Sequence, residues 1–461
     1  MSSASTVNDA SLAAETARLL EFGKASVWAG GRGAAYLDSQ GEPDFSLGIQ
    51  TWITARMVHT FALAHLLGVA GADQVAAQAL AGLTGVLHDS EYGGWYHGVD
   101  INGQPDLAAG KTAYDHAFVL LAAASAVMAG IPNLPGTPAA IELLADAAGV
   151  YLDKFWDAQT GRPVDTWSYD FKRLEPYRGL NATMHSVEAL LAVADAVEML
   201  SGSEGQGLIE RPAVPEGGNS AGVSGIIATL GTAGEWRSRA ASAAALAVEL
   251  APAHQNRLPE HFVAASDGQW ITDLELNKDR PDDQFKPYGA TPGHGLEWAR
   301  LLLNLEVALA SQEVASAPID TTKLLPTAIS LFDTAVADAW AVDGADGFAY
   351  TTNWAGDPVV TTRMHWVVCE AMAAAAALYT RTGDPRYRSL LDLWWDYAQR
   401  YLIDNVNGSW HHELDGANQP AATVWPGKPD IYHAVQATLI PRLPLAGSVP
   451  GAVLQQYRGA A

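Results

Sequence analysis

An imidazole and a carboxylate stand one helical turn apart in the stretch ATPGHGLEWARLLLNL, residues 290–305. Pro292 and Gly293 mark the start of a helix, and the apolar run that follows predicts its buried body. His294 and Glu297 share the face at the first turn. Imidazole takes up and releases protons near neutral pH, and a carboxylate one turn away can hold the ring in one tautomer. The pattern predicts proton-transfer chemistry at the start of this helix.

Five other apolar helical segments carry polar or aromatic side chains near their starts. Taken alone, each histidine is more simply interpreted as a buried residue with a hydrogen-bond partner. Their recurrence favours one shared pocket, and aromatic walls with hydrogen-bonding groups suit a sugar. In such a pocket an arginine would stabilise an enediolate oxygen, as an aldose–ketose isomerase or an epimerase requires. In chain order the five groups are Trp52, Arg56 and His59; Tyr114, Asp115 and His116; Asn181, His185 and Glu188; His365, Trp366 and Glu370; and Asp430, His433 and Gln436.

Motifs for other chemistries are missing from the sequence. It contains no HExxH or HxxEH zinc motif and no GxxxxGK[ST] phosphate loop. His411, His412 and Glu413 form the tract most like a metal site, but adjacent residues of an extended segment point to opposite faces. The single cysteine, Cys369, lies in an apolar run and is expected to be a small buried hydrophobe. We therefore expect proton transfer without a metal or other cofactor.

Twelve apolar segments with helical spacing would have to position these groups. Four tracts between them, GGWYHGVD, GRPVDTW, GFAYTTNW and GSWHHEL, are candidates for short strands. Inner and outer helices that alternate along the chain would close into an all-α toroid of six hairpins, whereas an open solenoid of hairpins stays as the alternative. The expected helices cover residues 8–22, 47–69, 73–88, 112–129, 137–157, 181–201, 222–250, 290–313, 321–340, 362–382, 386–403 and 430–442.

Composition limits the partners and the setting. The 461 residues, 49% of them hydrophobic, are expected to form a single catalytic domain, residues 1–461, with a flexible loop at the Gly- and Pro-rich tract 201–223. A net charge of −24 argues against nucleic acid or an anionic membrane as a partner. We find neither a secretory signal nor an apolar run long enough to cross a bilayer, so a cytoplasmic location is expected. Assembly into a homo-oligomer stays open.

Taken together, six segments resemble the N-acylglucosamine 2-epimerase superfamily. They are RMVHTFALAHLLG, YDHAFVLLAAA, NATMHSVEALL, YGATPGHGLEWARLLL, MHWVVCEAMAAAAALY and WPGKPDIYHAVQ, and the likeness spans about residues 20–445. The chain is most similar to the branch of metal-independent aldose–ketose isomerases that act on mannose or sulfoquinovose. The resemblance implies an (α/α)6 barrel with an axial pocket.

The resemblance also implies roles for individual residues. His433 would move a proton between C2 and C1 of the sugar through a cis-enediol. His294, oriented by Glu297, would assist ring opening, and Arg56 would bind the oxygens on the reacting carbons. Which histidine is the base is less firmly implied than the pair itself. The residues implied to hold the sugar are Tyr114, Asn181, His185 and Trp366.

The identity of the sugar depends on charge. The sulfonate of sulfoquinovose would need cations or several donors, for which Gln284, Lys286 and Lys428 are candidates. Since both lysines are more simply interpreted as loop residues paired with solvent or carboxylates, interconversion of mannose and fructose is the expected reaction. A sulfoquinovose isomerase, a sugar 2-epimerase and a non-catalytic sugar-binding barrel stay as alternatives.

Overall fold

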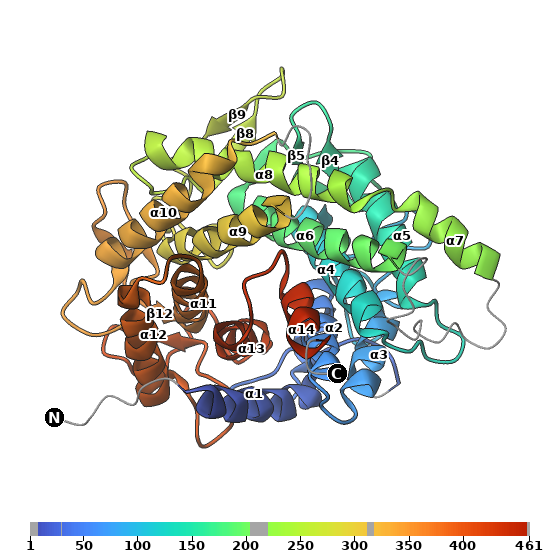
Figure 1. Ribbon diagram of the computed structural model, residues 1–461, viewed down its shortest axis with the longest axis horizontal. Coiled ribbons are helices and arrows are strands. Elements are labelled where there is room, and N and C mark those ends of the chain that lie inside the picture. Colours follow the sequence, from blue (N-terminus) through green and yellow to red (C-terminus); the bar gives the residue numbers. More distant parts are fainter. Residues whose placement is uncertain (1–7, 29, 203–219, 311–317, 459–461) are drawn as a thin grey trace.

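Two concentric rings of helices make up the molecule (Figure 1). The computed structural model describes residues 8–28, 30–202, 220–310 and 318–458. The inner ring consists of α2 (Thr51–Leu66), α4 (Ala113–Ala129), α6 (Leu180–Gly202), α9 (Pro292–Ala310), α11 (His365–Thr382) and α13 (Tyr432–Leu439). The outer ring consists of α1 (Asp9–Gly23), α3 (Ala72–Leu83), α5 (Ala140–Val150), α8 (Ala233–Ala253), α10 (Leu324–Ala339) and α12 (Pro385–Tyr397).

The inner ring closes between the two ends of the chain. Each inner helix packs against the next one, and α13 contacts both α2 and the first outer helix, α1. Each of the other inner helices also packs against at least one outer helix. This arrangement is an (α/α)6 barrel, which confirms the expected all-α fold and rules out the open solenoid.

The position of each helix follows from how its apolar residues are distributed. In α4 every residue except Tyr114 is buried, because inner helices are covered on all sides. In α12 only one stripe is buried, which includes Tyr387, Leu391 and Trp394 at helical spacing. Cys369 is buried within α11, as expected. Among the described residues no helix is both long and apolar enough to cross a membrane.

Short antiparallel strands hold the starts of the inner helices. Strands β1, β3, β7 and β12 each end directly before an inner helix, so their pairing fixes where the first turns lie. The four predicted strand tracts all contain strand residues, but the three-stranded sheet β7–β8–β9 was not predicted. The pairs are β1 (Ile49–Gln50) with β2 (Gly98–Val99), β3 (Lys111–Thr112) with β6 (Thr166–Trp167), β4 (Trp156–Asp157) with β5 (Arg162–Pro163), β10 (Thr351–Thr352) with β11 (Pro358–Val360), β12 (Arg363–Met364) with β13 (Glu413–Leu414), and β8 (His261–Ala264) with both β7 (Tyr177–Gly179) and β9 (Trp270–Thr272).

The expected helix at 222–250 is wrong in one respect, because two helices occupy it. α7 (Ser220–Thr229) ends before Gly231, whose φ of 69° lies in the left-handed region that favours glycine. Thr232 then caps α8 through a reciprocal capping box with Glu235. The expected loop 201–223 is also too long, since α6 includes Gly202 and α7 begins at Ser220; the remainder, 203–219, lies outside the described residues.

A last helix, α14 (Val449–Arg458), was not predicted and packs across α2 and α6 (Figure 1). Single π-helical turns extend α5 and α12, at Tyr151–Phe155 and Ala398–Leu402. The 3-10 turns are Lys24–Ser26, Phe45–Leu47, Thr321–Lys323 and Ile440–Arg442. The last of these contains Pro441 and explains why α13 is shorter than expected.

Candidate active site

A cavity of about 430 Å³ opens where the inner helices begin. Of the residues predicted to act on or to bind the sugar, only Lys428 is absent from its walls, which are drawn from both halves of the chain. The predicted residues that line it are Arg56, Tyr114, Asn181, His185, Gln284, His294, Glu297, Trp366 and His433. The size suits a small ligand, and the walls combine indole and phenol rings with imidazole, amide and guanidinium groups.

His433, near the start of α13, is held by a buried carboxylate on the neighbouring helix α11. Its Nδ1 lies 3.0 Å from Oε1 of Glu370, at hydrogen-bonding geometry. The other oxygen of Glu370 accepts a hydrogen bond from Nε of Arg300 at 3.1 Å. Although burial alone would raise the pKa of Glu370, the charge of Arg300 holds it below its usual value. An ionised Glu370 fixes the proton of His433 on Nδ1 and leaves Nε2 as a base.

His294 has a different carboxylate partner from the one expected. Its Nδ1 lies 3.0 Å from Oε1 of Glu260, an ion-pair contact without hydrogen-bond alignment. The ring of His294 packs on Trp366, with 5.1 Å between the ring centroids. The expectation that Glu297 orients His294 is therefore wrong, because the ring turns from its own helix toward the segment before β8. No helical spacing links Glu260 to the site, so the sequence carried no signal for it.

Glu297 instead contacts Arg300 on its own helix and His185 on α6. Its Oε1 lies 3.3 Å from the guanidinium of Arg300 and 3.9 Å from Nδ1 of His185. Burial and the nearby charge of Glu370 raise the pKa of Glu297 well above its usual value. One cation thus serves two carboxylates: Glu370 is the ionised one, and Glu297 favours its neutral form.

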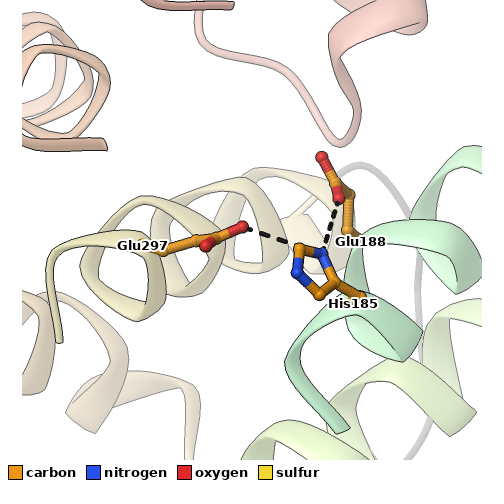
Figure 2. A group of neighbouring side chains, drawn as sticks. All are labelled: His185, Glu188 and Glu297. Atoms are coloured by element: carbon orange, nitrogen blue, oxygen red, sulfur yellow. Dashed lines mark hydrogen bonds and ion pairs between the residues drawn. The ribbon is translucent and has the colours of Figure 1, made fainter. Parts of the chain in front are cut away.

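His185 lies between two carboxylates, Glu188 on α6 and Glu297 on α9 (Figure 2). Their ligating atoms all lie within 4.8 Å of one another, so the three residues have the donor types and spacing of a metal site. Glu188 also accepts a hydrogen bond of 2.6 Å from the hydroxyl of Tyr432, and the guanidinium of Arg300 contacts Glu297. These partners already satisfy both carboxylates. Burial lowers the pKa of His185 to about 4, so its ring is neutral near pH 7.

Arg56 is a buried cation at the wall of the pocket. It contacts Oδ2 of Asp430 at 3.0 Å and donates a hydrogen bond of 2.8 Å to the hydroxyl of Tyr114. Its guanidinium also lies 4.9 Å from the ring centroid of Trp52, within cation–π range. Although burial alone would lower the pKa of Arg56, its neighbours Tyr114 and Asp430 raise it above the usual value. The site thus holds a permanent positive charge.

Lys428 lies outside the pocket, so the expectation that it binds substrate is wrong. Its ammonium contacts Asp404 at 2.7 Å and donates a hydrogen bond of 2.6 Å to the carbonyl of Gly408. Lys111, before α4, makes the same two contacts, with Asp89 and with the carbonyl of Gly93. Both lysines are buried and tie the loop before an inner helix to an earlier loop. Lys428 therefore belongs to a repeated structural device.

Other predicted polar residues divide between the pocket and the packed interior. Trp52, His365 and Asp430 line the pocket. His59 and His116 are buried outside it, where His59 contacts the hydroxyl of Ser125 and His116 contacts the backbone of Thr112 and Trp95. The amide of Gln436 donates to Glu188 at 3.4 Å. His59 and His116 therefore fit the simpler interpretation, that of buried residues with hydrogen-bond partners.

The tract His411, His412 and Glu413 splits as the alternation of an extended segment predicts. His412 faces the pocket and stacks on His365 at 3.7 Å between ring centroids. Glu413 accepts hydrogen bonds from the backbone N–H groups of Val424 and Trp425, so it anchors a turn. The three side chains do not converge on one point. Of the described residues, the group that has metal-site spacing is the one around His185.

Comparisons with known proteins agree with this geometry. The family model described as N-acylglucosamine 2-epimerase matches residues 31–201 and 226–437. A D-mannose isomerase from Thermobifida fusca is 43% identical over 96% of both chains, and one from Pseudomonas cannabina pv. alisalensis is 40% identical over 96% of this chain and 94% of its own. Among solved structures, a D-mannose isomerase superposes with a TM-score of 0.74 at 25% identity, covering 94% of this chain and 98% of its own. A cellobiose 2-epimerase from Spirochaeta thermophila DSM 6192 superposes with a TM-score of 0.68 at 19% identity, covering 94% and 95%, and so supports the fold. The chain belongs to the N-acylglucosamine 2-epimerase family.

Proposed function

We propose that this protein is a D-mannose isomerase, which interconverts D-mannose and D-fructose. One observation carries the proposal. Two imidazoles, each in contact with its own buried carboxylate, flank the same indole: His294 and His433 lie 5.1 and 6.0 Å from Trp366 between ring centroids. The relatives at 40–43% identity supply the choice of sugar.

In the proposed reaction His433 is the base. Its Nε2 removes the proton from C2 of open-chain mannose, and the C–H electrons form the double bond of a cis-enediol as the C1 carbonyl oxygen takes up a proton from solvent water. His433 then returns its proton to C1 while the C2 hydroxyl gives its proton to solvent water and becomes the carbonyl of fructose. Glu370 stabilises the imidazolium that forms in between.

Charged and polar neighbours would support the enediol. The fixed charge of Arg56 stabilises negative charge on the oxygens of C1 and C2. Glu297, in its neutral form, can donate a hydrogen bond to a sugar oxygen. Tyr114, Asn181 and His185 would hold further hydroxyls from the same walls. Since these residues come from both halves of the sequence, we also propose that the whole chain works as a single catalytic domain.

The test is incubation of chelator-treated protein with mannose, fructose, glucose and sulfoquinovose in separate samples, with products separated by chromatography. Fructose from mannose, and mannose from fructose, is the expected result. Glucose from mannose would indicate a 2-epimerase, and turnover of sulfoquinovose alone would place its sulfonate beside Gln284 and Lys286, which both line the pocket. Binding without turnover would leave a sugar-binding barrel.

A His433→Ala variant tests the assignment of the base. We expect it to lose turnover while its melting temperature stays close to that of the wild type, because the ring lies at the pocket wall. Isomerisation within threefold of the wild-type rate would overturn the role of His433.

A further inference from the structure

His365 is the first residue of α11 and lines the pocket, yet the proposed proton transfers give it no role. Strand β12 ends directly before it and pairs with β13, so the backbone at His365 lies beside the backbone at His412. The N–H of His365 donates a hydrogen bond of 3.0 Å to the carbonyl of His412. The pairing of these two short strands therefore fixes where the His365 ring enters the pocket wall.

The same carbonyl fixes the tautomer of the His365 ring. Nδ1 of His365 lies 3.3 Å from the carbonyl oxygen of His412, and because a carbonyl can only accept, Nδ1 carries the ring proton. In the neutral ring Nε2 then has a lone pair and no proton. Among the described residues none donates a hydrogen bond to this Nε2, so it is left as an acceptor at the pocket wall. A polar atom in such a place is expected to find its partner in a ligand or in water.

Neighbouring groups keep the His365 imidazole neutral. Burial, and then the charge of a protonated His433, lower the pKa of His365 to about 3. The ring stacks on His412 with 3.7 Å between the centroids, where two imidazolium ions would repel each other. The centroid of the His433 ring lies 6.3 Å away. A neutral His365 therefore does not oppose the positive charge that His433 gains as the base.

We propose that His365 is a specificity-determining residue, whose Nε2 accepts a hydrogen bond from one sugar hydroxyl away from the reacting carbons. Arg56 already serves the oxygens of C1 and C2, and O5 carries no proton in the pyranose ring, so this hydroxyl lies at C3, C4 or C6. A neutral acceptor offers no N–H to a sulfonate or a phosphate, so this part of the wall favours a hydroxyl over an anionic group. The inference rests on the proposed function for its choice of sugar.

The test combines a change in the protein with a change in the sugar. His365→Phe keeps an aromatic ring in the stack and removes both nitrogens. The sugars 3-, 4- and 6-deoxymannose each lack one hydroxyl and keep the groups at C1 and C2 that the reaction needs. For mannose and for each deoxy sugar, the measured quantity is the kcat/KM of the wild type divided by that of the variant. The open-chain fraction of a sugar is the same in both assays and cancels in this ratio.

We expect the ratio to be about tenfold or more for mannose and for two of the deoxy sugars. For the third it should lie within about threefold of unity, because that sugar lacks the hydroxyl that His365 would bind. His365→Gln, whose amide oxygen can stand in for Nε2, should stay within about threefold of the wild type with mannose. His254→Phe is the matched control, since its ring lies at the end of the outer helix α8 and outside the pocket; all four ratios should be close to unity. A thermal melt of each variant establishes that it is folded.

A second measurement needs neither turnover nor the Phe variant. In wild-type protein with 15N-labelled histidine, the unprotonated Nε2 of His365 is identified as the signal that His365→Gln lacks. Addition of mannose should shift this signal, because the nitrogen gains a hydrogen bond. The deoxy sugar without the contacted hydroxyl should shift it far less than the other two deoxy sugars do.

The outcomes separate this inference from the proposed function. The same loss for all four sugars in His365→Phe overturns the inference, since the ring would then have only a structural effect. A loss below threefold with mannose, or an Nε2 signal that stays in place under saturating mannose, also overturns it. If the wild type binds mannose without turning it over, the proposed function fails, whereas the shift of the Nε2 signal still decides the role of His365.

Discussion

The hydrogen bond between Glu370 and His433 provides the most specific prediction about catalysis. Replacing Glu370 by Gln keeps the size of the side chain and removes the negative charge 3.0 Å from Nδ1. Two unit charges 4 Å apart attract each other by about 4 kcal/mol at an effective dielectric constant of 20. Since His433 becomes a cation when it takes the C2 proton, the transition state loses about this amount, which is about a thousandfold in kcat.

The tautomer of His433 strengthens the expected effect. Arg300 donates to one oxygen of Glu370, so it would hold the amide oxygen of a glutamine there and turn the NH2 group toward His433. An NH2 group facing Nδ1 requires the tautomer that carries its proton on Nε2, and that tautomer cannot accept the C2 proton. We therefore expect kcat to fall while KM for mannose changes little.

The assay is the initial rate of fructose formation from mannose over a range of mannose concentrations. Glu306→Gln on the outside of α9 is the control for removal of a carboxylate, and a thermal melt of each variant establishes that it is folded. A folded Glu370→Gln variant with kcat within threefold of the wild type would refute the assignment of His433 as the base supported by Glu370.

Three further predictions concern the loop lysine, a histidine in the pocket wall and metal ions. Lys428→Met should lower the free energy of unfolding by about 3 kcal/mol, because it leaves the buried Asp404 without its cation. KM for mannose should stay the same. Urea titration measures the first effect and steady-state kinetics the second, and a raised KM would show that Lys428 does bind substrate. The charge of Asp115 raises the pKa of His97 to about 9, so the stabilisation that His97 contributes should be complete below about pH 6.5 and be lost as the pH rises through 9. Urea titrations of wild type and His97→Gln across this range should show the difference in free energy shrinking, and a difference independent of pH would contradict the ion pair. Prolonged treatment with a chelator should leave the isomerisation rate unchanged, since the proposed proton transfers use protein groups alone; a loss restored by one divalent metal would instead assign a ligand role to His185, Glu188 and Glu297.

Much of the architecture could be predicted because the signals were local. Apolar runs bounded by Gly, Pro, Asp or Asn located the inner and outer helices, and polar residues at the helix starts located the pocket. The apolar pattern gave wrong helix boundaries where residues that end one helix and start the next lie inside an apolar tract. The tract at 222–250 looked like one helix, although Gly231 and the capping box of Thr232 with Glu235 divide it.

The site residues that the sequence placed incorrectly depend on contacts between distant segments. Glu297 is one turn from His294, but the imidazole contacts Glu260, some 34 positions earlier, which no periodicity could indicate. Arg300, three residues after Glu297, resembles an ordinary helix-surface partner, yet it lies buried between α9 and α11, where it also holds Glu370.

One internal signal could have corrected the placement of Lys428. The tracts DSEYG at 89–93 and DNVNG at 404–408 share an Asp and a Gly four positions apart, and each is followed about twenty residues later by a lysine before an inner helix. In the structure that Asp and that Gly hold the lysine. Comparing the loops with one another would have indicated a structural lysine.

Proton transfer between C2 and C1 of mannose through an enediol can be tested by proton NMR of mannose incubated with the protein in D2O. We expect fructose to accumulate and solvent deuterium to enter at C1, because a proton held on His433 exchanges with solvent before it returns to carbon. Fructose formed with no deuterium at C1 throughout the conversion would contradict a proton transfer that exchanges with solvent, and failure of mannose to react would contradict the proposed reaction itself.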